Sequence, residues 1–239
     1  MFFRQLLHEE ASCASYVAGC PSHGVAAVVD AQGDVGRYVA LAERHGLRIT
    51  DVMDTHVHAD HRSATRDLAA KTGARLHLGA EAEVGFDYLP LRDGDVIKVG
   101  NRKIEAMHTP GHTPEHVSLL VDDWFVLTGD TLFVGDVGRV DLALQDIDAG
   151  EMERRARTLH ASLQRLLTLE DHVEVYPGHY AGSTCGRGMD GKPMSTIGRE
   201  RRFNEPLRLD EEGFVSFQLE SVPPLPEDFE TIKRANVAA

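Results

Sequence analysis

The chain has 239 residues, 42% hydrophobic and 26% charged, which is the composition of an ordinary globular protein with one full hydrophobic core. Its net charge of −13 argues against a nucleic-acid partner, because binding to phosphates needs a basic surface. Because it has no apolar run near the roughly 20 residues of a membrane span, no signal-peptide core and no C-x-x-C pair, we expect a cytoplasmic protein without a membrane partner.

Strands and helices alternate in the first half of the chain. The predicted helices run from a cap at Asp34 to about residue 45, with Gly46 as the stop, and over residues 63–72, ended by Gly73. Before, between and after these helices, apolar runs and turn residues predict short strands at residues 3–7, 15–17, 25–29, 47–53, 75–78, 96–99 and 103–108. Asp122-Asp123 separates two further apolar runs and predicts a hairpin.

The clearest element of the second half is a helix over residues 148–168. Asp148 and Glu151 fit the first and last positions of a capping box. The buried face is predicted from apolar residues at three- and four-residue intervals, namely Met152, Ala156, Leu159, Leu163 and Leu166. After this helix we predict a core strand at 173–176, a loop at 181–194 and a short helix at 196–204. A Pro-rich stretch then leads to a tail. The pattern predicts one α/β domain, with helices covering a mixed sheet, over residues 1–239.

The segment Thr55-His56-Val57-His58-Ala59-Asp60-His61 is the strongest functional signal. It holds four metal-capable side chains, and neither a strand nor a helix would make all four converge. A loop between the strand at 47–53 and the following helix would do so. Such a loop lies at the carboxyl end of a strand, where α/β proteins place their ligands.

Three later segments share one design, in which an apolar strand ends and a glycine precedes a metal-capable residue. These residues are His112, Asp130 and His179, after Gly111, Gly129 and Gly178. The three cysteines do not accompany these histidines along the sequence. We therefore expect an open catalytic metal site and not a closed, cysteine-rich zinc site.

The order of these residues resembles the metallo-β-lactamase superfamily. The resemblance spans residues 50 to 180 and consists of His56-x-His58-x-Asp60-His61 with His112, Asp130 and His179. It implies an αββα sandwich, with two mixed β-sheets flanked by helices and metals at one edge of the sheets. Glyoxalase II thioesterases and persulfide dioxygenases both carry all seven residues, so the ligands alone leave both branches open.

The neighbouring sequence is more similar to the persulfide dioxygenases. The block from Gly129 to Asp141 contains Gly138-Arg139-Val140-Asp141, which resembles the Gly-Arg-x-Asp of that branch, and the stretches from Tyr176 to Ser183 and from Ser195 to Asn204 are also similar. Some of these dioxygenases are fused to a rhodanese domain. Only 35 residues (239 − 204) follow Asn204, so we expect no rhodanese domain and place any sulfurtransferase partner on a separate chain.

This resemblance implies one Fe(II) per chain held by His56, His112 and Asp130, a two-histidine, one-carboxylate set typical of non-haem iron oxygenases. The implied reaction converts a thiol persulfide, such as glutathione persulfide, with O2 and water to a thiol and sulfite. Four further residues would line a second metal position or hydrogen-bond the iron ligands and tune them: His58, Asp60, His61 and His179. In the glyoxalase II alternative, two zinc or mixed metal ions hydrolyse a thioester of glutathione.

The substrate contacts are predicted from family positions near the thiol carrier. They are Arg139, Tyr180 and Arg201, of which the arginines suit the carboxylates of a glutathione-like molecule. Cys185 is interpreted as an ordinary thiol. Formation of a homodimer is left open by the sequence. A nuclease of the same superfamily is disfavoured by the acidic charge.

Overall fold

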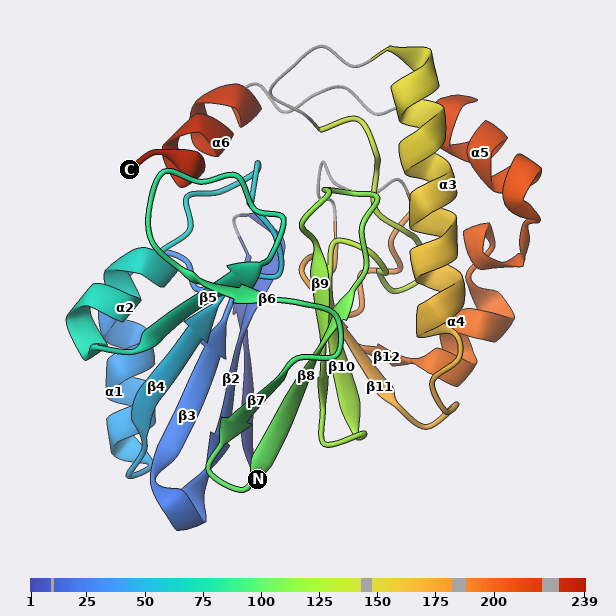
Figure 1. Cartoon of the computed structure of the whole chain (residues 1–239). Coiled ribbons are helices and arrows are strands. Elements are labelled where there is room, and N and C mark those ends of the chain that lie inside the picture. The colour runs from blue at the N-terminus through green and yellow to red at the C-terminus, as the bar shows by residue number, and fades with distance from the viewer. Residues whose placement is uncertain (10, 143–147, 182–187, 221–227) are drawn as a thin grey trace.

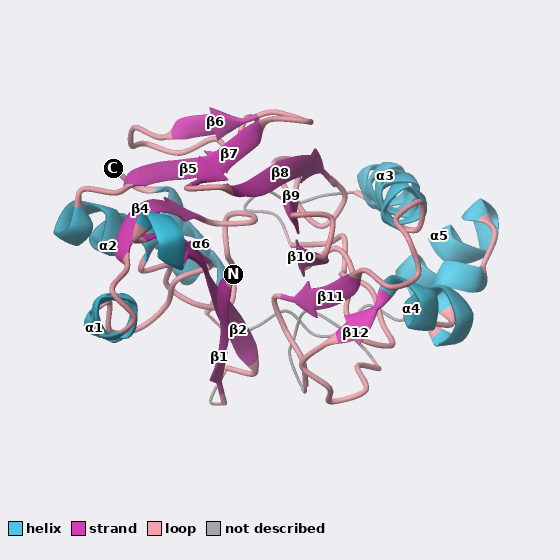
Figure 2. Ribbon diagram, turned by 90° about the horizontal axis from the view of Figure 1, so that it is seen from below, coloured by secondary structure: helices cyan, strands magenta, loops and turns pink. Residues whose placement is uncertain are grey.

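Two six-stranded β-sheets face each other, and helices cover the outer side of each (Figure 1, Figure 2). The computed structural model describes residues 1–9, 11–142, 148–181, 188–220 and 228–239. This αββα arrangement of two mixed sheets confirms the fold class predicted from the sequence. The apolar faces of sheets and helices must be buried. Here the two sheets pack against each other on their inner faces and against helices on their outer faces, which buries the apolar side of every layer.

The first sheet contains the first six strands in chain order. They are β1 (Phe2–His8), β2 (Cys13–Cys20), β3 (Val25–Val29), β4 (Arg48–Met53), β5 (Arg75–Gly79) and β6 (Leu89–Leu91). The strands from β3 to β6 run parallel, whereas β1, β2 and β3 pair antiparallel. Two helices cover its outer face, α1 (Gly36–Arg44) and α2 (Thr65–Thr72).

The second sheet has the order β12-β11-β10-β9-β8-β7. Its strands are β7 (Val96–Val99), β8 (Arg102–His108), β9 (Val117–Val121), β10 (Phe125–Gly129), β11 (Glu174–Pro177) and β12 (Ser195–Thr196). Only β10 and β11 pair in parallel. Its outer face carries α3 (Ala149–Leu166), α4 (Ile197–Phe203) and α5 (Glu211–Glu220), with the short 3-10 helix Pro206–Arg208 packed among them. A second 3-10 helix, Pro21–His23, lies between β2 and β3.

Local sequence signals locate several elements correctly. The Asp148 carboxylate accepts a hydrogen bond from the Glu151 amide at 2.8 Å, as an N-cap should. Glu151 and Arg155 form an ion pair on the outer side of α3. Asp122 and Asp123 both have positive φ, as the tight turns that join antiparallel strands require, and the Trp124 amide donates to the Val121 carbonyl at 2.9 Å across the turn.

Two predictions for the helices differ from the structure. The α1 helix begins at Gly36, and Asp34 accepts a hydrogen bond from the Gly36 amide instead of serving as the cap itself. The predicted tail contains the helix α6 (Phe229–Val237), while the Pro-rich stretch at 223–226 lies outside the described residues. The helices α5 and α6 are short, and most of the stability of such helices comes from tertiary packing. Their sequences alone therefore predict them poorly.

The loop between β8 and β9 is held against α3 by close packing. Gly111 has φ 136°, and a Cβ built there would lie 2.5 Å from the backbone of Leu159. The neighbouring Pro110 carbonyl accepts a hydrogen bond from the Ser162 hydroxyl at 2.7 Å. This helix therefore fixes the loop that carries His112.

We expect Gly111→Ala to destabilise the fold by about 2 kcal/mol or more, because both its φ and its contact with Leu159 exclude a side chain. Urea unfolding measures this change. Gly33→Ala is the matched control, because Gly33 has a similar need for positive φ but no atom within 4 Å of the added Cβ. Equal losses in the two variants would contradict the packing explanation.

Candidate metal centre

The predicted metal-capable residues meet at one end of the two sheets. His56 lies in the loop after β4, His112 in the loop after β8, Asp130 after β10 and His179 after β11. Hydrogen bonds join the two sheets there, including Val117 N to Thr55 O at 2.8 Å and Ala14 N to Gly178 O at 2.8 Å. Loops far apart along the chain thus share one rigid edge.

His56, His112 and Asp130 form a buried group of metal-capable side chains. The Asp130 Oδ2 atom lies 3.9 Å from His56 Nε2 and 3.7 Å from His112 Nε2. Among the described residues, His56 Nε2 and Asp130 Oδ2 are buried without a hydrogen-bond partner. Such orphaned atoms are costly unless a ligand satisfies them. Two metal–ligand bonds of about 2.0–2.2 Å would span these separations, so the residues fit a transition-metal ion.

The other ring nitrogens of the two histidines are held by the protein. His112 Nδ1 donates to the Arg139 carbonyl at 2.8 Å. His56 Nδ1 contacts Thr55 Oγ1 at 3.0 Å, and this hydroxyl in turn donates to the Asp30 carboxylate. Both Nε2 lone pairs are therefore available to a metal. Burial lowers the pKa of His56 well below its ordinary value and also lowers that of His112, which keeps both rings neutral at pH 7.

Asp130 is joined to Asp60 through His179. His179 Nδ1 lies 2.8 Å from Asp130 Oδ1, and its Nε2 lies 2.9 Å from Asp60 Oδ2. Burial by itself raises the pKa of Asp130, but His179 and His112 outweigh it and lower this pKa to about 2. Asp130 is consequently an anion that offers one oxygen to a metal and the other to His179.

His116, which the sequence did not single out, supports Asp130. Its Nε2 accepts a hydrogen bond from the Asp130 amide at 3.0 Å, and its Nδ1 contacts the hydroxyls of Thr109 and Thr131. Burial lowers the pKa of His116 to about 3, so the ring stays neutral and can accept this bond. It thus positions the backbone of the metal ligand.

His58 and His61 each present one nitrogen to a carboxylate and leave the other without a partner. His58 Nε2 lies 3.3 Å from Asp30 Oδ1, and His61 Nδ1 lies 2.9 Å from Asp60 Oδ2. In the described part of the chain, His58 Nδ1 and His61 Nε2 are buried without hydrogen bonds. His58 also borders a cavity of about 220 Å³ behind the metal loop, which Asp54 and Asn236 help to line.

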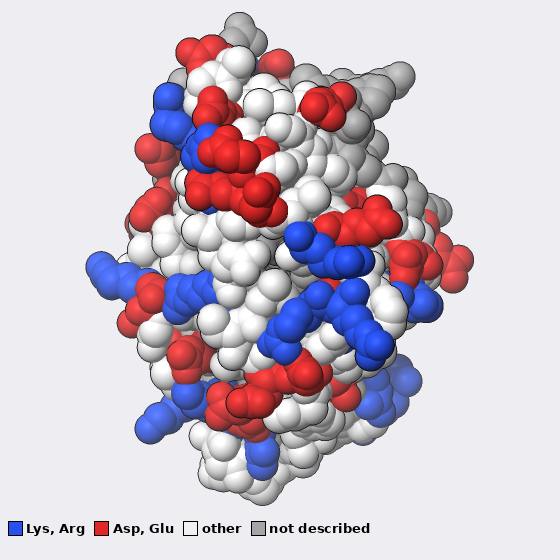
Figure 3. Space-filling view, turned by 90° about the vertical axis from the view of Figure 1, so that its right-hand side faces the viewer, with Lys and Arg blue, Asp and Glu red and all other residues white. Residues whose placement is uncertain are grey.

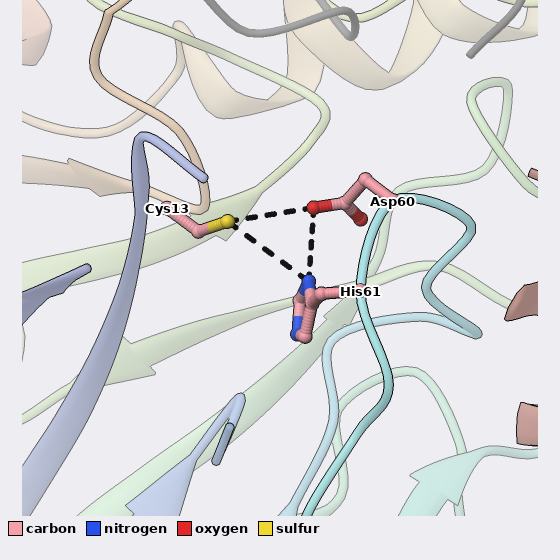
Figure 4. A group of neighbouring side chains, drawn as sticks. All are labelled: Cys13, Asp60 and His61. Carbon is pink, nitrogen blue, oxygen red and sulfur yellow. Dashed lines mark hydrogen bonds and ion pairs between the residues drawn. The ribbon is translucent and has the colours of Figure 1, made fainter. Parts of the chain in front are cut away.

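Cys13 corrects the expectation that the cysteines do not accompany the histidines. This residue begins β2, and its Sγ lies 3.4 Å from Asp60 Oδ2 and 4.0 Å from His61 Nδ1 (Figure 4). Antiparallel pairing of Cys13 with His179 brings it there. Cys13 precedes the metal loop by about forty residues, so its position along the chain did not predict this contact. Cys185 lies outside the described residues.

The three predicted substrate contacts lie in different surroundings. The Arg139 side chain is buried and forms a two-pronged pair with Asp141, with 2.6 Å contacts. Arg201 pairs with Asp171 and donates to the Leu167 carbonyl at 2.6 Å. Their substrate role stays a prediction, as does that of Tyr180, whose amide donates to Ser12 O.

On the face formed by the helices α3, α4 and α5, Lys and Arg are interspersed with Asp and Glu (Figure 3). Arg157 pairs there with Glu153, Glu211 and Glu212. Such alternation gives no single-signed surface of the kind that attracts polyanions.

The C-terminal helix α6 clamps the metal loop, which the sequence did not predict. The Asn236 amide group donates to the carbonyls of His58 and His61 at 2.9 and 2.8 Å and accepts from the Ser63 amide at 3.0 Å. One turn earlier on the same helix, Lys233 donates to the Leu142 carbonyl. Three hydrogen bonds from one side chain restrict the backbone that carries His58, Asp60 and His61.

Comparison with known proteins places this site in a family. The model of the metallo-beta-lactamase superfamily matches residues 9–179. A hydroxyacylglutathione hydrolase from a Polaromonas species is 31% identical over 241 residues, covering 90% of this chain and 88% of its own. The chain belongs to the metallo-beta-lactamase superfamily.

Two solved structures resemble the chain over nearly its whole length. A metallo-beta-lactamase from Staphylococcus aureus has a TM-score of 0.91 and 33% identity, covering 99% of this chain and 72% of its own. ETHE1 from Myxococcus xanthus has a TM-score of 0.83 and 32% identity, covering 99% and 96%. Within the described ranges, no helix is both long enough and apolar enough to cross a membrane.

We expect Asn236→Ala to weaken metal affinity about tenfold or more, because outer hydrogen bonds commonly contribute this much. Chelator competition on the full chain measures the affinity. Arg234→Ala on the same helix is the control, since Arg234 is exposed and pairs only with Glu230 in the described contacts. Unchanged metal affinity in Asn236→Ala would show that the clamp does not position the metal loop.

Proposed function

We propose that the chain is a persulfide dioxygenase with one Fe(II) held by His56, His112 and Asp130. The reaction is R–S–SH + O2 + H2O → R–SH + H2SO3, in which the sulfane sulfur is oxidised to sulfite and O2 is reduced. The thiol carrier is glutathione or a similar small molecule. The observation that carries the proposal is the convergence of two neutral imidazoles and one carboxylate on a common point.

The surroundings of His179 support a mononuclear centre. Both of its nitrogens are directed at carboxylates, Nδ1 at Asp130 and Nε2 at Asp60, so in this arrangement His179 links the two acids. The Gly138-Arg139-Val140-Asp141 block is similar to the persulfide dioxygenases. The likeness to ETHE1, which covers almost all of both chains, fits the same branch.

The chain's own residues would orient the reactants and control charge. Iron bound at the three ligands would supply the redox chemistry that the reaction needs. The backbone carbonyl of Arg139 accepts a hydrogen bond from His112 and so aligns the His112 ring. The Arg139 side chain is held by Asp141. Asp130 would balance part of the positive charge of the ion, and the contact with His179 restrains the Asp130 carboxylate. The ligands are almost fully buried, which excludes bulk water from the reacting sulfur.

A hydrolase of the glyoxalase II kind is the second candidate. It is favoured by the unpartnered His58 Nδ1 and His61 Nε2, which are two more buried nitrogens available to metal ions. The hydroxyacylglutathione hydrolases at about 30% identity also agree with it. In this case two ions would activate water for attack on a thioester.

Oxygen uptake by the iron-loaded full chain with glutathione persulfide tests the first candidate. We expect uptake by the wild type, and loss of both iron and activity in His56→Ala, His112→Ala and Asp130→Ala. His108→Ala is the control, because His108 ends β8 just before the loop that carries His112, but its ring bonds only to Pro114 O in the described contacts. Cleavage of S-lactoylglutathione without O2 uptake would instead identify the hydrolase.

Proton release on Fe(II) binding provides an independent test. Binding at the first three ligands should release almost no protons at pH 7, because His56 and His112 are already neutral and Asp130 is ionised. A second ion must displace the proton of His61. Burial alone lowers the pKa of His61, but Asp60 and Cys13 raise it to about 10, so the ring is protonated at pH 7.

Anaerobic calorimetry in two buffers of different ionisation enthalpy counts these protons. We expect one Fe(II) per chain with close to zero protons released. Release of about one proton or more together with a second bound ion would contradict the mononuclear proposal.

A further inference from the structure

Two cationic side chains come from helices on opposite sides of the metal edge. Lys233 lies on α6 and Arg155 on α3, and Figure 1 shows these helices on either side of the end of the sheets where the metal loop lies. The Lys233 amine donates a hydrogen bond to the Leu142 carbonyl at 3.0 Å, and Arg155 Nε donates to Glu151 at 2.9 Å. Each of the two side chains is therefore held in place by one partner.

Arg155 has a donor atom that nothing in the described part of the chain satisfies. Its Nη1 atom is buried there without a hydrogen-bond partner, and only 17% of the side chain is exposed. A buried guanidinium nitrogen without an acceptor is costly, so this atom favours an acceptor that the protein itself does not provide. Carboxylates are acceptors whose shape matches a guanidinium group.

Lys233 and Arg155 act on the same region of the molecule. Burial lowers the pKa of Lys233, Glu115 opposes this shift, and the positive charge of Arg155 adds to it. Burial is also the main cause of the lowered pKa of His112, and Lys233 contributes to that shift. The two cations thus lie near each other and near the metal centre, and an anion between them would relieve their repulsion.

Nearby acids of the chain do not fill this place. Glu115 is buried, but its Oε1 atom accepts from the Val57 amide at 2.8 Å, and in the described ranges it forms no ion pair with either cation. Glu151 contacts only Nε of Arg155. The Nη1 side of Arg155 and the remaining donors of the Lys233 amine are therefore available to a ligand.

We propose that Arg155 and Lys233 bind a carboxylate of the thiol carrier and thereby hold its sulfur at the metal. This assignment rests on the proposed function, because it concerns the substrate of the same site. The family resemblance places the carrier beside Arg139, Tyr180 and Arg201 and gives no role to Arg155 or Lys233.

The two arginines predicted from the resemblance already have acids beside them. Arg139 pairs with Asp141, and Arg201 pairs with Asp171. A carboxylate of the carrier would have to compete with these acids, whereas at Arg155 Nη1 it would meet an unsatisfied donor.

Binding of S-methylglutathione to the full chain with its bound metal tests the proposal. This thioether keeps both carboxylates of glutathione and has no reactive sulfur, so calorimetry measures its Kd without turnover. We expect Arg155→Met and Lys233→Met each to weaken binding about tenfold or more, because each loses a charge-assisted hydrogen bond. Lys233→Arg, which keeps the charge, should retain the affinity of the wild type.

The neighbouring cations on the same helices provide matched controls. Arg154 pairs with the same Glu151 but is 70% exposed, and Arg234 is exposed and pairs with Glu230. Arg154→Met and Arg234→Met should leave the Kd of S-methylglutathione unchanged. Circular dichroism establishes that every variant is folded.

The diethyl ester of S-methylglutathione tests whether a carboxylate is the bound group. The wild type should bind the diester about tenfold or more weakly than the diacid, and Arg155→Met and Lys233→Met should cause no further loss, since the interaction is already absent. Equal binding of the diacid by the wild type and both variants, or no binding by the wild type, would overturn the proposal. Loss confined to S-methyl-coenzyme A would overturn the carboxylate in favour of a phosphate.

This binding experiment and the O2 uptake experiment can fail separately. Intact, variant-sensitive binding of S-methylglutathione without O2 uptake would reject the dioxygenase and leave the carboxylate site. O2 uptake together with binding that neither variant changes would reject the carboxylate site alone.

Discussion

The buried carboxylate of Asp130 is the constraint on which the site depends. An ionised carboxylate inside a protein is costly unless its oxygens are satisfied. Here one oxygen is held by His179, and the other faces His56 and His112 without a hydrogen bond. The polypeptide alone leaves this charge incompletely compensated, and a bound cation completes it. Metal binding and stability of this edge of the fold are therefore coupled.

Neighbouring elements hold that arrangement from several sides. His116 supports the Asp130 backbone, α3 packs directly on the loop that carries His112, and Asn236 of α6 fixes the loop after β4. These contacts come from both sheets and from the C-terminal helix. A metal centre built in this way is preorganised by the complete fold, so distant substitutions can alter metal affinity without touching the ion.

The protonation states around the centre divide it into two halves. His56 and His112 are neutral through burial, whereas Asp60 raises the pKa of His61 and favours its protonated form. The neutral half suits a cation at once, while the half with Asp60 and His61 must first lose the proton of His61. This asymmetry gives a physical reason for one ion to bind before another and supports the mononuclear proposal over a filled pair.

The sequence by itself determined the metal loop, the order of His112, Asp130 and His179, most strands and the helix α3, because these follow from local spacing, capping and alternation. It also predicted the αββα fold through family resemblance. Only the tertiary structure placed Cys13 beside Asp60, Asn236 under the metal loop and Arg139 on Asp141. Cys13 and Asn236 contact residues that are far from them along the chain. The Arg139 side chain turns to Asp141 because it is buried in the folded protein. Neither periodicity nor motif spacing encodes such contacts, because they exist only once both sheets and α6 have packed.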